Sequence, residues 1–380
     1  MARRVLVARG GAIPLESGLG RAHHDLVHRL DSGMISDFVD AEVIEHPLGG
    51  GAFKRWKQRR FNHPRKVLEI VEQEAKDYPD TILHITDQEQ AHLIPQDSPL
   101  STSITVHDLF HLKPRTIQTS TGSVQVGTRF PGFVRSRDLV HIRKGLGRAD
   151  LLVCISEATA NEAREIWPEK EIAVVPHGID VDGYNPFSYP LEKPQSIDYD
   201  KVNLLYVGSE EDRKRLDFLI EVLGHLPNDV KQNVILHKVG AESSTSKRQH
   251  LDSKSQSLGV QMNWVGRVED SELYGFYQHC DALIFPSLAE GFGLPPLEAM
   301  ASGCPIRSAN CPAHNEVCPK EWLLDFEDLD SWVDSIVEIA GESMNRGRRQ
   351  PCEIALSHAK NFNIKHWSSR LGTAWSTLRK

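Results

Sequence analysis

The sequence predicts an α/β protein made of two Rossmann-like domains that face each other across a cleft. The chain has 380 residues, about twice the usual domain length of roughly 100 to 200 residues. Short apolar or β-branched runs alternate with amphipathic stretches, which is the pattern of parallel strands joined by crossover helices. Residues 185–195 contain three prolines and lack a helical or strand period, so they are expected to link two domains.

Each half contains its own set of expected strands. In the first half they cover 5–8, 41–45, 81–86, 103–106, 151–155 and 172–175. In the second half they cover 202–207, 234–239, 260–265, 281–285 and 323–326. We therefore expect an N-terminal domain over 1–188 and a C-terminal domain over 199–361, followed by a helical stretch whose apolar residues recur every three to five positions.

Composition excludes several classes of protein. Hydrophobic residues make up 39% and charged residues 25% of the chain, which is ordinary for a globular protein. The sequence contains no run of about 18 apolar residues, so no transmembrane helix is expected. The short apolar run before Arg9 predicts a first strand instead of a secretory signal. Six cysteines without disulfide-like spacing predict reduced thiols in the cytoplasm. The net charge of −8 argues against a nucleic-acid partner.

The most informative segment follows the expected strand 281–285. It reads Glu290-Gly-Phe-Gly-Leu-Pro-Pro-Leu-Glu298, with Pro295 where the first helical turn should begin and Glu298 expected inside that turn. Backbone N–H groups of Gly291, Phe292, Gly293 and Leu294 at such a helix start would form an anion site. The simpler alternative is that Glu298 complements the helix dipole and that Glu290 is a solvated loop residue.

This strand, the glycines, the two prolines and two glutamates eight residues apart resemble the Glu-x7-Glu signature of retaining glycosyltransferases of family 4. The resemblance implies the GT-B fold and a nucleotide-sugar donor held by the C-terminal domain. It also implies that Glu290 contacts the donor sugar, that Glu298 accepts hydrogen bonds from the ribose, and that the helix 362–380 around Trp367 crosses back to the N-terminal domain.

Two segments of the first half extend the resemblance. Gly18 and Gly20, in the stretch 17–21, open the first expected helix as the family's glycine-rich loop does, although a tight turn would explain them equally well. His107 ends the fourth expected strand and is similar to the family's histidine that faces the donor sugar. Its neighbour Asp108 would as easily cap the following loop.

In the second half, Gly208 is followed by Arg213 and Lys214, a strand, loop and helix start similar to the family's phosphate-gripping segment. The two cations would neutralise the leaving diphosphate. Cations are poorly placed at a helix start, so an anion is expected to compensate them. Ser209 departs from the arginine that many members carry, and Val268 is expected to contact the nucleotide base.

Two sequence patterns superficially resemble metal-binding sites, but neither has the context that such a site requires. Cys311, His314 and Cys318 have a spacing that superficially resembles a metal site, but the Glu-Val pair at 316–317 matches an ordinary strand-and-turn of the family. Three Asp-x-Asp strings lie in a loop, a linker and a helix start, where single acidic residues are common; they are 180/182, 198/200 and 328/330. No metal or cofactor is expected.

The segment 53–66 carries seven basic and three aromatic residues within an acidic protein. Such a segment could contact an anionic membrane or grip a lipid phosphate or charged acceptor, and the alternative is a solvated basic loop. Family acceptors are often lipid-linked, so peripheral contact with the cytoplasmic membrane face is one interpretation of this segment, beside the solvated loop.

Taken with its residues, the resemblance implies a metal-independent, retaining hexosyltransferase with a mannose-like donor and a glycan, lipid-linked or small-molecule acceptor. A phosphorylase or a nucleotide-sugar epimerase on the same architecture is disfavoured by the spacing of the glutamates. A protein of the same fold that binds donor or membrane without turnover is the alternative, because Ser209 departs from the pattern and Arg307 places a charge in an apolar strand.

Overall fold

The computed structural model describes residues 2–13, 18–47, 49–120, 122–346 and 350–378. The chain forms two compact units. Unit 1 comprises residues up to 115, 127–178 and those from 364 onward, and unit 2 comprises 116–126 and 179–363. The expected domains, 1–188 and 199–361, divide the chain slightly later. The reason is that Tyr184, which precedes the proline-rich segment, packs on Tyr274 of unit 2 with ring centroids 4.3 Å apart.

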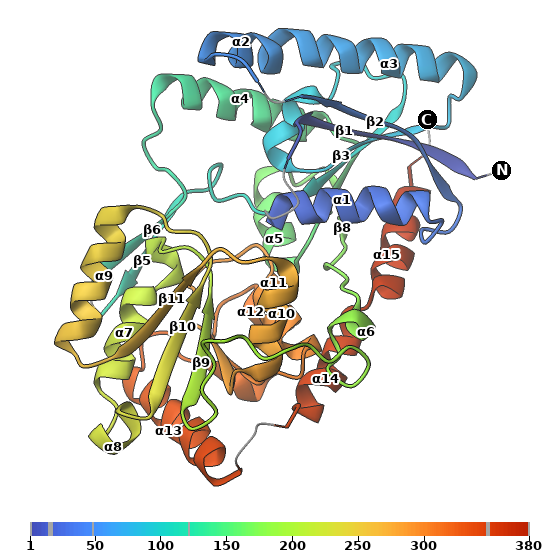
Figure 1. Ribbon diagram of the computed structural model, residues 1–380. Coiled ribbons are helices and arrows are strands. Elements are labelled where there is room, and N and C mark those ends of the chain that lie inside the picture. The colour runs from blue at the N-terminus through green and yellow to red at the C-terminus, as the bar shows by residue number, and fades with distance from the viewer. Residues whose placement is uncertain (1, 14–17, 48, 121, 347–349, 379–380) are drawn as a thin grey trace. The chain divides into compact units, whose positions relative to one another are not determined.

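Unit 1 is built on a six-stranded sheet in the order β2-β1-β3-β4-β7-β8 (Figure 1). Every neighbouring pair is parallel. The strands are β1 (Arg3–Gly11), β2 (Phe38–His46), β3 (Ile82–Ile85), β4 (Ser101–Val106), β7 (Leu151–Cys154) and β8 (Glu171–Val174). The strands expected in this half are all present.

Helices cover both faces of this sheet. Apolar residues of α3, α4 and α5 form one core with the sheet, and those of α1 and α15 form a second core on other strand residues. The helical elements are α1 (Gly18–Asp31), α2 (Ala52–Lys57), the π-helix η1 (Gln58–Asn62), α3 (His63–Asp77), the 3₁₀ helix η2 (Gln88–Leu93), α4 (Phe133–Arg148), α5 (Glu157–Ile166) and α15 (Ile364–Ser376). The last helix of the chain therefore belongs to the first unit, as expected.

Unit 2 has a second six-stranded parallel sheet, in the order β11-β10-β9-β12-β13-β14. Its strands are β9 (Val202–Val207), β10 (Val234–Val239), β11 (Gln261–Gly266), β12 (Ala282–Phe285), β13 (Ile306–Ala309) and β14 (Leu323–Leu324). The α/β class with two parallel sheets is thus confirmed.

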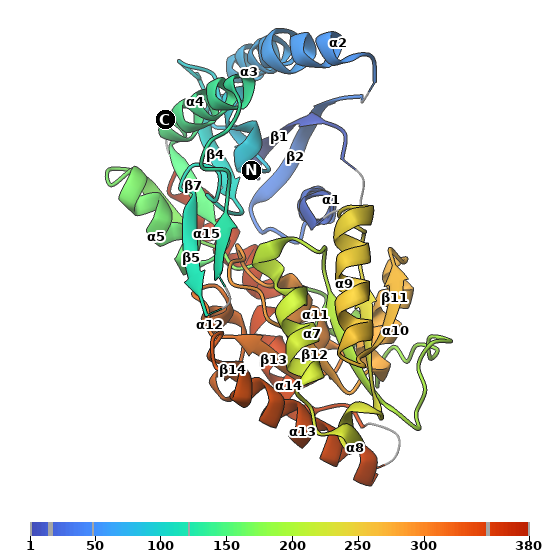
Figure 2. The same ribbon diagram turned by 90° about the vertical axis from the view of Figure 1, so that its left-hand side faces the viewer.

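The helices of unit 2 also form two groups. Apolar residues of α7, α9 and α13 share one core with the sheet (Figure 2), while α11 contacts both α10 and α14. The helical elements are α6 (Val181–Tyr184), the 3₁₀ helix η3 (Asp212–Lys214), α7 (Leu216–Gly224), α8 (Asn228–Lys231), α9 (Thr245–Ser257), α10 (Asp270–His279), α11 (Leu294–Ala301), α12 (His314–Val317), η4 (Lys320–Trp322), α13 (Leu329–Arg346), α14 (Glu353–Ala359) and η5 (Lys360–Phe362).

A two-stranded sheet of β5 (Arg115–Thr119) and β6 (Gly122–Val126) is absent from the sequence-based expectations. Residues 116–126 leave unit 1 in the middle of its sequence and pack with unit 2. The Ser120 amide donates to Oε1 of Glu327 over 2.8 Å, and β6 contacts η3. These partners lie about 90 to 200 residues further along the chain, so no local sequence pattern predicts the contacts.

The C-terminal helical stretch is interrupted, which the helical period alone did not predict. Asn363 is extended, with φ −73° and ψ 160°, and separates η5 from α15. Here Ile179 pairs with Asn363 in an isolated parallel bridge, and its amide donates to the carbonyl of Phe362 over 2.9 Å. The two connections between the units therefore run side by side at this point. Among the described residues, none of the helices has the length and hydropathy needed to span a bilayer.

Trp375 of α15 offers a test of how strongly the last helix stabilises unit 1. Its side chain is 0% exposed, donates from Nε1 to Oγ of Ser103 over 3.0 Å, and lies edge-on to Phe38 and His84 at 5.3 and 5.2 Å. Trp375→Ala is expected to lower the free energy of unfolding by about 3–5 kcal/mol, measured with urea. The exposed Thr373→Ala on the same helix should change it by less than about 0.5 kcal/mol, and equal effects would contradict the assignment.

Candidate functional site

The strand order of unit 2 locates its ligand-binding edge. Numbered within the unit, β9 to β14 run 3-2-1-4-5-6, the doubly wound order in which ligands bind where the order reverses, at the carboxyl ends of the strands. The reversal lies between β9 and β12, which pair in parallel. The loops that follow these two strands contain Arg213 and Lys214 on one side and Glu290 on the other.

These three side chains form one ionic cluster. Lys214 Nζ lies 3.0 Å from Oε1 of Glu290 and Arg213 Nη1 lies 3.0 Å from Oε2, so each cation takes one carboxylate oxygen. Ser287 Oγ donates to Oε1 of Glu290 over 2.9 Å. The anion expected to compensate the two cations is therefore Glu290 itself, which lies 76 residues away in the sequence.

The cluster keeps the carboxylate ionised. Burial alone would raise the pKa of Glu290, but the adjacent Lys214 and Arg213 outweigh it and lower the pKa to about 2. The same contact raises the pKa of Arg213 although burial opposes it. Arg213 also pairs with Glu211, whose Oε2 lies 3.0 Å from its Nε, so a polyanion that reaches this edge would meet Lys214 held by Glu290 and Arg213 held by two carboxylates.

The backbone of the β9 loop is shaped to hold Lys214. Gly208 has φ +153°, and a Cβ there would lie 3.1 Å from Cδ of Lys214, so a side chain at position 208 would crowd the lysine stem. The expected role of Gly208 at this site agrees with that placement. Its contact with a donor stays a prediction.

A second ion pair behind this loop was not foreseen. Glu210 and Lys238 contact each other with side chains 0% and 2% exposed, and Lys238 Nζ also donates to the carbonyls of Gly240 and Ala241 over 2.9 and 3.1 Å. Burial would raise the pKa of Glu210, but Lys238 and Ser243 lower it overall. A lysine in the mostly apolar β10 was the available signal, because a buried charge requires a partner.

Helix α11 begins as the prolines predicted but places its acid differently. It starts at Leu294, with Pro295 in the first turn and Gly293 at φ +120° before it. The first turn contains no acidic residue, so the expectation that Glu298 lies in it is wrong. Phe292 is buried and lies edge-on to Phe362 at 6.0 Å, while Gly291 is half-buried. Whether these four residues bind an anion stays a prediction.

Glu298 is buried between tyrosines, which the sequence did not indicate. Tyr277 donates to Oε2 over 3.0 Å, and Tyr184 donates to Oε1 over 3.5 Å. Tyr184 comes from α6 and Tyr277 from α10, so three distant segments meet at this carboxylate. A ribose contact of Glu298 stays a prediction, as does a base contact of Val268, which is half-buried just after β11.

In unit 1, His107 ends β4 and is buried. Its Nε2 lies 3.1 Å from the carbonyl oxygen of Thr86. Because a carbonyl only accepts, Nε2 carries the proton and Nδ1 is the acceptor. Burial lowers the pKa of His107, and the bond to Thr86 offsets this only in part, so the ring is neutral near pH 7. His177 stacks on it at 5.5 Å.

Asp108, the neighbour of His107, has a local role. Its Oδ1 accepts from the amide of Phe110 over 3.2 Å, so it caps its loop. Gly18 is the first residue of α1, and Gly20 is buried within this helix. Ser17 lies outside the described residues, and the contacts of both glycines with a donor stay predictions.

Several residues of the apparent metal patterns have other roles in the structure. His314 Nδ1 lies 2.9 Å from the carbonyl oxygen of Ala309 and 3.1 Å from Oγ of Ser308, while Cys311 and Cys318 are buried free thiols. Asp180 and Asp328 accept from backbone amides at the starts of α6 and α13. Over the described ranges, no three His, Cys, Asp or Glu side chains are grouped so as to hold a metal ion.

The basic segment 53–66 is helical and not a loop. It runs through α2, η1 and the first turn of α3. Phe53, Trp56 and Phe61 are 74%, 47% and 55% exposed, and their rings contact one another at 5.8 and 5.4 Å. An exposed aromatic cluster of this kind is uncommon on a surface without a partner.

Comparison with known proteins shows what the second half of the chain resembles. Residues 190–347 match the family of glycosyl transferases group 1, and the match includes Arg213, Lys214 and Glu290. The resemblance to glycosyltransferases that the two glutamates indicated is thereby confirmed.

Relatives of known activity resemble part of the chain. The serotype-specific mannosyltransferase WbdA of Escherichia coli is 32% identical over 182 residues, which is 45% of this chain and 22% of that protein. The D-inositol 3-phosphate glycosyltransferase of Geodermatophilus obscurus is 30% identical over 177 residues, which is 43% of this chain and 39% of that protein. The matched segments thus span well under half of these relatives.

Solved structures extend the similarity in fold to the whole chain. The lipopolysaccharide outer core galactosyltransferase WaaB aligns with a TM-score of 0.67 at 17% identity, covering 99% of this chain and 100% of that one. Anabaena HepE, solved with UDP and glucose, aligns with a TM-score of 0.67 at 15% identity over the same shares. The chain therefore has the GT-B fold.

The depressed pKa of Glu290 makes a pH-dependent prediction. A carboxylate whose pKa falls from 4.5 to about 2 on folding stabilises the folded state above pH 4.5, and this contribution is lost as the pH falls toward 2. Glu290→Gln should therefore lower the free energy of unfolding by up to roughly 3 kcal/mol at pH 7, and by less at pH 3.5, in urea titrations. The exposed Glu321→Gln should show no such dependence; equal stability of Glu290→Gln and wild type at pH 7 would contradict the ionic cluster.

Proposed function

We propose that this chain is a glycosyltransferase that moves a hexose from a nucleotide-sugar donor with retention at the anomeric carbon. The observation that supports this most is the cluster of Arg213, Lys214 and Glu290 at the point where the strand order of unit 2 reverses. Two convergent cations suit a diphosphate, and their position at the reversal of the strand order supports a ligand there.

In the proposed mechanism the donor diphosphate takes over the two cations. Arg213 offers a planar fork and Lys214 a compact ammonium, so together they stabilise the charge that develops as the phosphate–sugar bond breaks. Glu290, released from the cations, accepts hydrogen bonds from donor-sugar hydroxyls, and Glu298 accepts from the ribose. No side chain needs to act as nucleophile, and the leaving phosphate deprotonates the acceptor.

The proposal assigns a contact to His107 and no role to a metal. Nδ1 of the neutral ring accepts from a sugar hydroxyl, while Nε2 stays on Thr86. Because Arg213 and Lys214 supply the positive charge at the diphosphate, the transfer is proposed to proceed without a metal or cofactor. The name of the WbdA relative contains mannosyltransferase, which supports a mannose-like donor.

The alternative, a protein that binds donor without turnover, rested on Ser209 and Arg307. Arg307 contacts α13, where Nη2 lies 3.2 Å from Glu338 and Nε donates to Ser335 over 2.5 Å. Its charge is therefore satisfied within the scaffold of unit 2, away from Glu290. Ser209 alone remains as a departure, and its hydroxyl donates to Glu211 over 3.1 Å.

A panel of nucleotide sugars tests the proposed activity. The full chain is expected to release nucleotide from at least one donor, slowly without acceptor. Lys214→Ala should lower kcat by roughly 10²–10³-fold, since it removes a charge that stabilises the transition state. Lys320→Ala, an exposed lysine of the same unit, is the matched control. Binding of a donor without nucleotide release would favour the alternative, and no binding would reject the proposal.

We also propose peripheral contact with an anionic membrane on the cytoplasmic face through the segment 53–66, with a lipid-linked acceptor as one candidate. The exposed Phe53, Trp56 and Phe61 lie among basic residues, a combination suited to an anionic lipid surface. Arg59 of η1 pairs with Asp138 of α4 over 3.1 Å, and the start of α4 adds the exposed Phe133. The six free cysteines support a reducing compartment.

Vesicle sedimentation tests this contact. The full chain should sediment with phosphatidylglycerol vesicles and less with phosphatidylcholine vesicles. Phe53→Ser/Trp56→Ser should release it, because it removes the apolar area that enters the interface. Met344→Ser/Ile354→Ser changes two residues that are similarly exposed in unit 2, at 59% and 58%, and should have no effect. Equal release by both double variants would contradict the proposed surface.

A further inference from the structure

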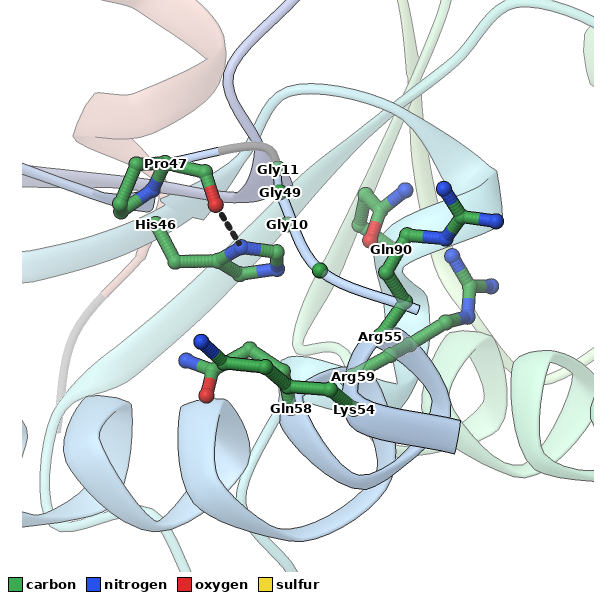
Figure 3. Close-up of a pocket in the computed structure, with 11 residues that line it drawn as sticks. Gly10, Gly11, His46, Pro47, Gly49, Lys54, Arg55, Gln58, Arg59 and Gln90 are labelled. Carbon is green, nitrogen blue, oxygen red and sulfur yellow. Dashed lines mark hydrogen bonds between the residues drawn. The ribbon is translucent and has the colours of Figure 1, made fainter. Parts of the chain in front are cut away.

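A cavity of about 440 Å³ lies in unit 1, away from every residue assigned above to the donor. This volume is within the range of roughly 300–1,000 Å³ that is typical of small-molecule sites. We call it the basic pocket; its informative lining residues are Gly10, His46, Lys54, Arg55, Arg59 and Gln90 (Figure 3).

The strand order places the basic pocket at a second ligand-binding edge. In unit 1 the order reverses between β1 and β3, because β2 lies outside β1. Gly10 is near the carboxyl end of β1, His46 ends β2, and Gln90 belongs to η2 directly after β3. Ligands of doubly wound sheets bind at this kind of reversal.

The charge of the basic pocket selects an anion. Lys54, Arg55 and Arg59 line it, and none of its described lining residues is acidic. Arg59 is partly neutralised by Asp138 at 3.1 Å. Across the described chain, neither Lys54 nor Arg55 makes an ion pair or a side-chain hydrogen bond. Two uncompensated cations of different geometry, a fork and a point charge, suit a phosphate group.

Gln90 adds a hydrogen-bond acceptor to the basic pocket, which calls for a donor group on the ligand in addition to a negative charge. Its side chain is 8% exposed, and its buried Oε1 has no hydrogen-bond partner. A Cβ at position 10 would collide with this amide, so the glycine there permits the approach. An unpartnered buried acceptor is costly. Because Gln90 lines the pocket, a turn of its amide toward the cavity would let a ligand hydroxyl donate to Oε1.

The cations and the exposed aromatic residues lie on different faces of the helical segment formed by α2 and η1. Lys54, Arg55, Gln58 and Arg59 recur at the spacing of one helical face and line the pocket. Phe53, Trp56 and Lys57 occupy the opposite face and are exposed. Lys54 and Arg55 are themselves exposed, but they lie on the face of the helix that lines the pocket and not on the face of Phe53 and Trp56.

We infer that the basic pocket binds a phosphorylated polyol or sugar, with the phosphate on Lys54 and Arg55 and a neighbouring hydroxyl on Gln90, and that this ligand is the acceptor. The assignment as acceptor rests on the proposed function; the ligand class rests on the pocket alone. A soluble sugar phosphate and a lipid headgroup with a phosphorylated polyol share this chemistry.

Calorimetric titration of the full chain at low ionic strength, without any nucleotide sugar, tests the ligand class. Glucose 6-phosphate should bind and glucose should not. Lys54→Ala/Arg55→Ala should weaken glucose 6-phosphate by about tenfold or more, because two charge-assisted contacts are lost. Lys76→Ala/Arg143→Ala removes the same charge from exposed positions of unit 1 and should retain the affinity. Equal losses in both double variants would overturn the pocket.

Two further arms separate the alternatives. Gln90→Leu should weaken glucose 6-phosphate while leaving inorganic phosphate unchanged; equal weakening of both would overturn the hydroxyl contact. If glucose 6-phosphate fails to bind but Lys54→Ala/Arg55→Ala weakens retention by phosphatidylinositol vesicles more than retention by phosphatidylglycerol vesicles of the same charge, the source is a lipid headgroup. If neither probe responds to that variant, the inference is wrong. If glucose 6-phosphate binds as expected but no donor of the nucleotide-sugar panel releases nucleotide, the proposed function is rejected and the ligand class of the pocket stands.

Discussion

Parallel strand pairing is the constraint on which both candidate sites depend. Each crossover returns the chain to the same edge of the sheet, so the loops after all strands of one unit gather at one edge. In unit 2 this gathers the loops that carry Arg213, Lys214 and Glu290, although they are 76 residues apart. In unit 1 the same constraint brings Gly10 beside Gln90. The chemistry differs between the units because the loops differ, while the position of each site follows from the strand order.

Much of the fold is predictable from the sequence because parallel strands buried on both faces read as apolar runs. Strands such as β9 and β10 agree with the expected ranges for this reason. The pair β5 and β6 was not predicted because its side chains are mostly half-buried or exposed and its contacts lie in unit 2. The interruption at Asn363 escaped for a related reason, since the bridge to Ile179 is a long-range contact.

The candidate site was predictable in residue types and not in pairing. The glycines and prolines around Glu290 indicate a helix start from local geometry, and Arg213 and Lys214 indicate an anion. That Glu290 is this anion in the free protein, and that Glu298 lies between Tyr184 and Tyr277, depends on three-dimensional proximity that no spacing encodes. The buried pair of Glu210 and Lys238 belongs to the same category. A lone charge in an apolar strand can indicate that a partner exists without identifying it.

The ionic cluster has a consequence for how a donor would bind. With a pKa of about 2, Glu290 stays ionised throughout the pH range in which a nucleoside diphosphate is also anionic. Donor binding is then an exchange of one anion for another on the same two cations, without proton uptake by this carboxylate. The cations need no new desolvation in that exchange, because Glu290 has already held them in a partly buried position, with side chains 18% and 15% exposed. In the proposed mechanism, Glu290 would hold Arg213 and Lys214 together in the free protein and would become available to the sugar only when the diphosphate has arrived.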